Sequence, residues 1–262
     1  MSREQVFFHS WAFLWDRGGV GQKKKQQRRY GIIIPVCDEE ACLGQVIDEL
    51  RQVLPKQDFV LVIGLNATSD ESGEIAEDRA VIVGRTEMRG YGYGCMAAID
   101  ALQAAGEEVD AYIFCAGDGA SRPQDVLCLV QRYEATGVAM VIGLRRFVLR
   151  TWWQQFGRAL PNLILGGVGF VLTGRFYHDL GPLRLIGRHL FGKLDLQEMT
   201  WGWTIEAEVK ASRLGQPVET IAVQERERVG GLQKVSGVSL IQSLKIGTFI
   251  MKAGVRARLV DY

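Results

Sequence analysis

The first half of the chain alternates short apolar runs with segments whose apolar residues recur at helical spacing. The runs are rich in β-branched residues and short enough to be buried strands; they cover 31–36, 59–63, 81–83 and 111–115. The helical segments between them cover 39–53, 71–78 and 95–105, with a glycine-rich turn expected at 90–94. Strands that alternate with helices form βαβ units, which build a parallel sheet. The pattern therefore predicts an α/β, Rossmann-like, mostly parallel sheet with helices on both faces and a ligand crevice at the carboxyl ends of its strands.

The second half is less regular after a further strand at 141–144. We expect helices over 154–174, 204–214 and 238–253, a loop and helix over 178–195, a strand over 218–224 and a basic loop over 226–237. The chain is thus divided into an N-terminal extension (1–29), one α/β domain (30–237) and a C-terminal amphipathic helix with its tail (238–262).

Composition narrows the class of protein. The 262 residues carry a net charge of only +1, which gives no bulk attraction for nucleic acid, so we expect no nucleic-acid partner. The five cysteines are odd in number and lack CxxC spacing, which disfavours a zinc site or a disulfide framework and favours a reducing, cytoplasmic location. The longest uncharged run, 159–174, is too short for a spanning helix.

The N-terminal extension differs from the rest of the chain. Residues 1–29 hold seven basic and two acidic residues, with five aromatic residues ahead of the basic run. Aromatic residues beside a lysine cluster can lie on an anionic membrane, which would place the protein on the inner face of the membrane. A solvated tail, or a segment packed on the domain, remains the alternative.

Polar residues gather where the predicted strands end. Asp118 follows the fourth strand in a glycine-flanked turn, and Glu39 and Arg145 follow two others. Carboxylates near arginines suit a nucleotide diphosphate, with or without a divalent metal, and Asp118 is the best metal-ligand candidate. The alternative for Asp118 is a turn residue that accepts hydrogen bonds from backbone amides. The chain lacks the GxxxxGK[ST] and GxSxG motifs, which disfavours a P-loop NTPase and an α/β-hydrolase.

Several segments, taken in order, resemble the family 2 glycosyltransferases of GT-A fold, and within them the dolichol-phosphate-mannose-synthase-like branch. The first half contributes "IIIPVCDEEACLGQVIDEL", "LNATSDESGEIAE", "RGYGYGCMAAIDAL" and "IFCAGDGASRPQDV". The second half contributes "DLGPLRLI", "WGWTIEAEVKA" and "RERVGGLQKVSG". The resemblance runs from about Tyr30 to Lys252. It implies a nucleotide-sugar site that includes Pro35, Val36, Glu39, Asn66 and Arg145.

The chain departs from the family pattern at acidic positions. Leu65 stands where an acidic residue usually contacts the base, and Ala116 replaces the first Asp of Asp-X-Asp, which leaves Asp118. Later acidic positions of that turn are Ser121 and Arg122. Three possibilities follow: Asp118 alone holds Mg²⁺ or Mn²⁺ with the substrate phosphates, an arginine (Arg122, Arg145 or Arg146) neutralises the diphosphate without a metal, or the donor site has decayed.

The acceptor half matches the family better. The resemblance makes Arg184 and Glu206 catalytic candidates beside Asp118, and it assigns acceptor phosphate binding to Arg226, Arg228, Lys234 and Ser236. A phosphate monoester is already anionic at neutral pH, with a second pKa of about 6, so it can attack without a protein base. A hydroxyl acceptor would need a base such as Glu206. A solvated charged loop remains the alternative for Arg226 and Arg228. Glu206 and Glu208 are two positions apart on a predicted helix, so we expect at most one of them to point inward.

These features predict an inverting glycosyltransferase that moves a hexose from a nucleotide sugar to a polyprenyl phosphate or another membrane-borne acceptor. The alternative is a non-catalytic relative that acts as a binding or partner module, which Leu65 and Ala116 favour. A nucleotidyltransferase is disfavoured because the acidic segment 36–40 is not a basic glycine-rich loop. The sequence gives no prediction of the oligomeric state.

Overall fold

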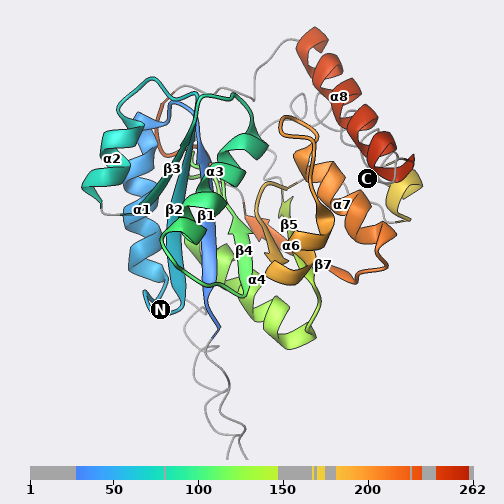
Figure 1. Ribbon diagram of the computed structural model, residues 1–262, viewed down its shortest axis with the longest axis horizontal. Coiled ribbons are helices and arrows are strands. Elements are labelled where there is room, and N and C mark those ends of the chain that lie inside the picture. Colours follow the sequence, from blue (N-terminus) through green and yellow to red (C-terminus); the bar gives the residue numbers. More distant parts are fainter. Residues whose placement is uncertain are drawn as a thin grey trace, which may run out of the picture.

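A seven-stranded sheet forms the centre of the protein, as the computed structural model shows (Figure 1). The structure describes residues 28–79, 81–146, 167, 170–174, 181–224, 226–231 and 240–259. The strands run in the order β3-β2-β1-β4-β6-β5-β7, and only β6 is antiparallel to its neighbours. Their bounds are β1 (Tyr30–Val36), β2 (Phe59–Asn66), β3 (Ile82–Thr86), β4 (Ala111–Phe114), β5 (Met140–Arg146), β6 (Arg184–Gly187) and β7 (Val218–Gln224). The predicted α/β, mostly parallel sheet is confirmed.

Helices cover both faces of this sheet, as predicted. The helices of the described residues are α1 (Glu40–Val53), α2 (Ser72–Asp78), α3 (Tyr91–Ala104), α4 (Pro123–Thr136), α6 (Arg188–Leu194), α7 (Trp203–Arg213) and, packed on α7, α8 (Leu240–Leu259). Alternate residues of β1 show how the layers are built: Ile32 and Ile34 face the core under α1 and α4, whereas Ile33 faces the core under α3, α6 and α7. All three isoleucines have no exposed surface. A strand buried on both faces explains the continuous apolar run in the sequence.

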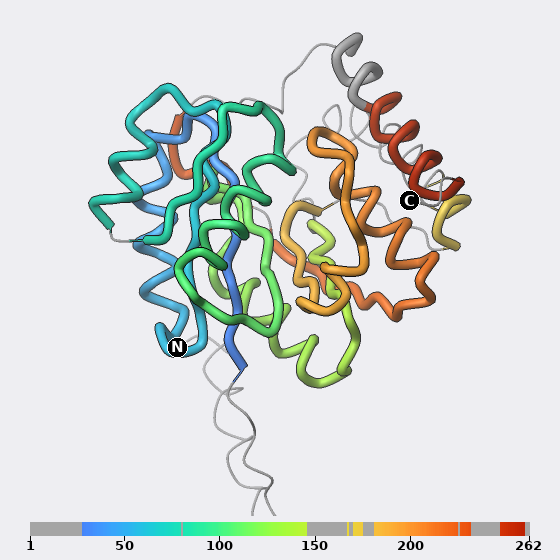
Figure 2. The backbone as a smooth tube through the Cα atoms, viewed as in Figure 1, coloured from blue at the N-terminus to red at the C-terminus, as the bar shows by residue number. Residues whose placement is uncertain are grey.

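The last helix, α8, packs on α7 at the outer edge of the molecule (Figure 2). A small third core joins them, with Ile205 and Val209 of α7 against Ala253 and Ala257 of α8. No helix in the described ranges combines the length and the apolar character needed to cross a bilayer. The extension at 1–29 lies outside the described residues except for its last two, so the three-part division of the chain stays a prediction.

Two sequence expectations are wrong in detail. The segment 178–195 was expected to be loop and helix, but its residues 184–187 form β6, which inserts antiparallel between β4 and β5. Four residues are too few to show a strand period. The glycine-rich turn expected at 90–94 lies mostly inside α3, which begins at Tyr91. A Cβ on Gly92 would stand 2.6 Å from the Trp203 ring, so this glycine serves close packing within a helix. The helix expected over 154–174 lies mainly outside the described residues.

Candidate donor site

The carboxyl end of β1 opens the crevice. Pro35 lies against α3, since a Cβ added at Gly94 would be 2.9 Å from the Pro35 Cβ. Val36 is 1% exposed and faces the core, so only its backbone is available to a ligand. Asp38 then turns the chain with a positive φ of 54°, an uncommon conformation for a residue with a side chain. That turn delivers Glu39 to the start of α1.

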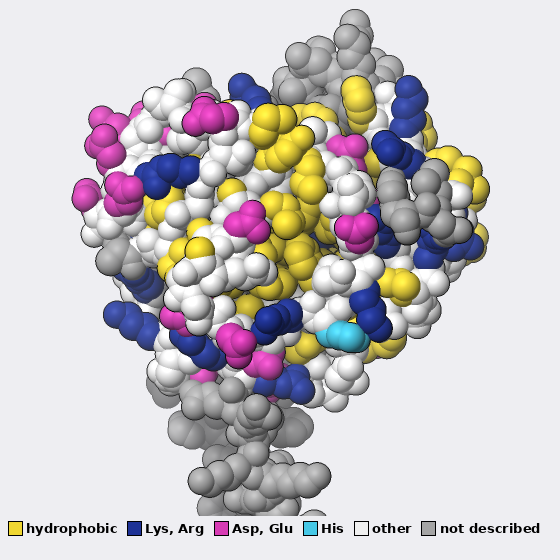
Figure 3. Space-filling view, in the orientation of Figure 1, with side chains coloured by type: hydrophobic (Ala, Val, Ile, Leu, Met, Phe, Trp, Pro, Cys, Tyr) yellow, Lys and Arg dark blue, Asp and Glu magenta, His cyan; other side chains and the backbone are white. Residues whose placement is uncertain are grey.

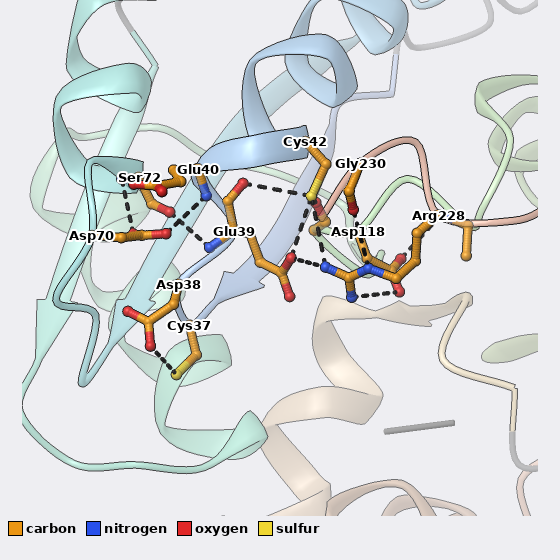
Figure 4. A network of polar contacts seen from close by, with 12 residues as sticks. Cys37, Asp38, Glu39, Glu40, Cys42, Asp70, Ser72, Asp118, Arg228 and Gly230 are labelled. Atoms are coloured by element: carbon orange, nitrogen blue, oxygen red, sulfur yellow. Dashed lines mark hydrogen bonds and ion pairs between the residues drawn. The ribbon is translucent and has the colours of Figure 1, made fainter. Parts of the chain in front are cut away.

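The loop after β2 is tied to this turn by side-chain hydrogen bonds (Figure 4). The Ser72 hydroxyl accepts from the Glu39 backbone amide at 2.9 Å, and Asp70 accepts from the Glu40 amide at 2.9 Å. Asp38 in turn accepts from the Ser69 amide at 2.7 Å. The first two bonds satisfy amides at the α1 N-terminus that have no partner within the helix, and all three fix both loops as one rim.

The turn after β4 brings Asp118 to the same rim. One oxygen of its carboxylate accepts a hydrogen bond from the Ala120 amide at 3.0 Å. Asp118 therefore has the role of a turn residue, which was the alternative to a metal ligand in the sequence analysis. The segment 226–231 lies over this turn: the Arg226 amide donates to the Ala120 carbonyl at 3.0 Å, and the Val229 amide donates to the Asp118 carbonyl at 3.3 Å. The carboxyl ends of β1 and β4 are therefore covered by a loop that follows β7.

Arg228 stands between Glu39 and Asp118 (Figure 4). Its Nη2 pairs closely with Glu39, and its Nη1 lies 3.5 Å from Asp118 Oδ2. The side chains of Arg228, Glu39 and Asp118 are only 12%, 13% and 25% exposed. Burial opposes the charge on Arg228, but the two carboxylates outweigh it and raise the pKa of the guanidinium. The group is a fixed positive charge inside an acidic rim.

Cys42 lies beside this cluster, with its Sγ 3.3 Å from a Glu39 oxygen. Burial, followed by the hydrogen bond to Glu39, raises the pKa of the Cys42 thiol to about 12. A thiol in this state is protonated and unreactive at neutral pH. Cys42 is therefore a packing residue of the rim.

The residues of this rim do not fit a divalent metal that is held by protein carboxylates. Mg²⁺ and Mn²⁺ prefer several hard oxygen ligands. Ala116 offers no side-chain oxygen, and the oxygens of Asp118 already face the Ala120 amide and Arg228. Within the described ranges, no three His, Cys, Asp or Glu side chains are grouped closely enough to hold an ion.

Arg226 anchors the covering loop on α1. Its guanidinium pairs with Glu49, and its Nε donates to the Gly119 carbonyl at 2.6 Å. The hydrogen bond from Arg226 holds the pKa of Glu49 below its ordinary value of 4.5. Because the pKa is depressed in the folded state, this stabilisation is present above the unfolded pKa and is lost as pH falls through the folded one.

Replacing Glu49 with glutamine is therefore expected to destabilise the protein at pH 7 but not at low pH. The pair is partly exposed, so we expect a difference of no more than about 1 kcal/mol in the free energy of unfolding at pH 7. The difference should shrink as pH falls below about 4.5, where the carboxyl protonates in the unfolded state, and vanish once it also protonates in the folded state at lower pH. Denaturant unfolding at both pH values checks it, with Glu87→Gln on the exposed surface as control. A difference that persists at low pH would show that the charge of Glu49 is not the cause.

The remaining donor-site candidates lie at the same edge of the sheet. Asn66 is 5% exposed and donates to the Gly90 carbonyl at 3.0 Å, so it ties β2 to α3. Leu65 points into the core under α1. Arg145 is the penultimate residue of β5 and pairs with Val223 of β7. Arg122 donates to Gln224 at 2.6 Å and so joins the β4 and β7 loops.

The two catalytic candidates of the acceptor half lie in the interior. Arg184 has no exposed surface: it donates to the Gly181 carbonyl at 2.6 Å and the Thr204 carbonyl at 3.1 Å, and lies 3.5 Å from Glu208. Glu206 is 2% exposed, lies 2.9 Å from Lys210 and accepts from the Gln197 and Glu198 amides. These contacts give both residues structural roles, and the structure does not bring them to Asp118.

The expectation that at most one of Glu206 and Glu208 points inward is wrong. Both are 2% exposed. The helix that carries them, α7, is covered by the sheet on one side and by α8 on the other, so residues on different helix faces are buried together. Lys234 and Ser236 lie outside the described residues, so their acceptor roles stay predictions.

Sequence reasoning missed the contacts that assemble the rim. Glu49 and Ser72 were not candidates, and Arg228 was assigned to the acceptor rather than to Glu39. Arg228 and Glu39 are 189 residues apart, and no local pattern in a single sequence reveals such a pair. Two cavities of about 350 and 560 Å³ lie elsewhere, one beside α7 and β7 and the other beside α6. Neither contains a residue of the rim.

Comparison with known proteins identifies the family of the chain. The model of glycosyl transferase family 2 matches residues 31–193. Two glycosyltransferases of uncharacterised activity, from Mycobacterium bovis and Mycobacterium tuberculosis, are 28% identical over 218 residues, which cover 79% of this chain and 89% of theirs.

Solved structures show the same fold. Glucosyl-3-phosphoglycerate synthase of Mycobacterium tuberculosis, in complex with phosphoglyceric acid, superposes with a TM-score of 0.66 at 15% identity, covering 95% of this chain and 88% of that one. Its complex with Mn²⁺, UDP-glucose and phosphoglyceric acid gives a TM-score of 0.65 at 16% identity, with 95% and 87% covered. The predicted GT-A fold is confirmed, whereas the dolichol-phosphate-mannose-synthase-like branch is not. Because the family model matches more than half of the chain, this protein belongs to glycosyl transferase family 2.

Proposed function

We propose that this protein transfers a hexose from a nucleoside diphosphate sugar to a phosphate-bearing acceptor, with inversion at the anomeric carbon. The observation that carries the proposal is the Glu39–Arg228–Asp118 cluster at the carboxyl ends of β1 and β4. Ligands of open α/β sheets bind at this edge. We assign the donor site to this cluster together with the Pro35 and Val36 backbone, Asn66 and Arg145, and the similar mycobacterial structures with UDP-glucose support a nucleotide there.

A phosphate acceptor suits the chemistry of this site. A phosphate oxygen attacks the anomeric carbon, a new C–O bond forms, and the bond from that carbon to the diphosphate breaks, releasing a nucleoside diphosphate. The phosphate is anionic at neutral pH and needs no protein base, which agrees with the burial of Glu206. The similar structure in complex with phosphoglyceric acid supports an acceptor that carries a phosphate group. We assign acceptor contacts to Arg226, Lys234 and Ser236.

We further propose that the acceptor is membrane-borne, a polyprenyl phosphate, and that α8 meets the membrane surface. The helix carries four basic residues and no acidic residue. Its outer face exposes Phe249, Val255 and Leu259 beside Lys252 and Arg256. Figure 3 shows basic and hydrophobic side chains next to one another at the edge where α8 lies. Apolar side chains among basic ones favour the surface of an anionic bilayer.

Release of nucleoside diphosphate tests this function. The full chain is mixed with UDP-glucose or GDP-mannose and with anionic vesicles that contain a short polyprenyl phosphate. We expect release that depends on the acceptor and that falls at least about a hundredfold in Asp118→Ala, a loss of about 2.7 kcal/mol in transition-state stabilisation. Asp100→Ala, on the exposed face of α3, is the matched control.

Other outcomes separate the parts of the proposal. Release with 3-phosphoglycerate but not with polyprenyl phosphate would contradict the membrane-borne acceptor and keep the transferase. Undiminished turnover in Asp118→Ala would contradict the site. No release across donors and acceptors would favour a non-catalytic member of the family.

A further inference from the structure

The position of Arg228 has a consequence for how the donor diphosphate is neutralised. A diphosphate that enters the rim meets two carboxylates, Glu39 and Asp118, so a positive charge must stand between protein and ligand. The guanidinium of Arg228 already lies at that point, paired with both carboxylates and only 12% exposed (Figure 4). A divalent ion placed there would meet a fixed positive charge.

The net charge of the rim is consistent with a guanidinium in the place of a divalent metal ion. With Ala116 in place of an acidic residue, the rim holds the carboxylates of Glu39 and Asp118, and Arg228 reduces their combined charge from −2 to −1. One guanidinium therefore offsets part of the negative charge of the rim without a divalent ion.

The guanidinium also has the geometry for a diphosphate. Arginine carries five N–H donors in a planar fork that matches phosphate oxygens. In Arg228 the Nε donates to the Gly230 carbonyl at 3.3 Å, and the Nη2 pairs with Glu39. The Nη1 lies 3.5 Å from Asp118 Oδ2, an ion pair longer than a good hydrogen bond, so a phosphate oxygen can compete for its N–H groups.

The backbone around Arg228 holds it in place. Gly230 lies against the Ala41 carbonyl, where an added Cβ would come within 2.4 Å, and Gly119 contacts Val229 in the same way at 2.7 Å. The backbone amides of Arg226 and Val229 also donate hydrogen bonds to the turn that carries Asp118. The loop is therefore fixed on both sides of Arg228. A cation held this firmly needs little reorganisation when a ligand binds.

We propose that the Arg228 guanidinium, in place of a divalent metal ion, is the cation that receives the diphosphate of the donor. This inference rests on the proposed function, because it takes a nucleoside diphosphate as the ligand of the rim. It gives Arg228 a donor role instead of the acceptor role expected from the sequence, and Asp118 becomes a residue that positions Arg228.

Metal uptake tests the inference without any substrate. Mn²⁺ is added to the full-length protein, and free Mn²⁺ is read from its electron paramagnetic resonance signal. We expect no depletion of free Mn²⁺ by an equimolar amount of the wild-type protein. The double variant Ala116→Asp/Arg228→Ala supplies a second carboxylate and removes the guanidinium, so we expect it to take up Mn²⁺. Stoichiometric uptake by the wild type would overturn the inference.

Nucleotide affinity is the second measurement. UDP, GDP, ADP and CDP are titrated calorimetrically in the presence of EDTA and then of Mn²⁺. We expect at least one to bind, with affinities in the two conditions agreeing within about twofold. Arg228→Met should weaken binding at least about tenfold, or 1.4 kcal/mol. Arg228→Lys should fall between, because an ammonium lacks the planar fork. Arg132→Met, which removes a surface pair with Glu219, is the control.

The outcomes distinguish the inference from the proposed function. A nucleotide that binds only with Mn²⁺ would overturn the inference and leave the transferase intact. Binding to Arg228→Met that equals wild type, in a variant with an unchanged melting curve, would also overturn it. If none of the four nucleotides binds under either condition, the inference and the donor site fail together. If Arg228→Met does not fold, Arg228→Lys and the Mn²⁺ uptake decide.

Discussion

Replacing Arg184 with alanine is expected to lower the free energy of unfolding by about 3–5 kcal/mol, the cost of leaving a buried charge without its partner. The side chains of Arg184 and Glu208 are 0% and 1% exposed and lie 3.5 Å apart. The alanine variant would also remove the donor that the Gly181 and Thr204 carbonyls now share. Since whole domains are stable by only about 5–15 kcal/mol, this loss would be visible in urea unfolding.

Two further variants make the result interpretable. Arg184→Met/Glu208→Leu removes both charges and keeps the volume, so we expect it to recover much of the loss. Arg188→Ala, whose side chain is 55% exposed and pairs loosely with Glu108 at 3.9 Å, should change stability by less than about 0.5 kcal/mol. If Arg184→Ala unfolds like wild type but loses turnover, the sequence-based assignment of Arg184 as catalytic would be right and its structural role wrong.

The fold was predictable because its signals are local. The apolar run at 31–36 and the helical spacing at 39–53 each fall within one element, and both lie where expected. The wrong predictions concern β6 and α7. β6 is too short to show a period, and α7 is buried on several faces because α8 covers the side that the sequence left to solvent. Burial by a distant element cannot be read from a helix's own pattern.

The donor rim was predictable only in part, for a similar reason. Topology alone brings Glu39 and Asp118 to the same edge of the sheet, because β1 and β4 are parallel neighbours. The orientation of Arg228 depends on a loop that follows β7, and the alternation of Arg226, Glu227 and Arg228 also fits a solvated surface. Only tertiary contacts distinguish the two readings. Asn66 lies at this edge as topology predicts, but its side-chain amide donates a hydrogen bond to the Gly90 carbonyl.

Replacing Gly64 with alanine is expected to cost roughly 3 kcal/mol or more, the upper range for overpacking a core. A Cβ at this position in β2 would stand 1.8 Å from the Gly94 carbonyl oxygen in α3. The obstacle is backbone, so no side chain can rotate away, and the whole helix would have to move. A Cβ added at Gly84 in β3 would stand 1.9 Å from the Ala97 carbonyl oxygen, so the same helix is held close to two strands. A second such site means that a shift of α3 cannot relieve the clash cheaply.

The matched control is Gly192→Ala in α6, where an added Cβ has no atom within 4 Å and the backbone is helical. There we expect no loss, or a gain of up to about 1 kcal/mol, because alanine favours helix more than glycine does. The Gly64 variant should also weaken the rim, since moving α3 lengthens the 3.0 Å bond from Asn66 to the Gly90 carbonyl. Urea unfolding measures the first effect, and amide hydrogen exchange at 90–94 measures the second. A Gly64→Ala protein within about 1 kcal/mol of wild type would show that α3 is not held against β2 as closely as described, and the position of Asn66 at the rim would lose its support.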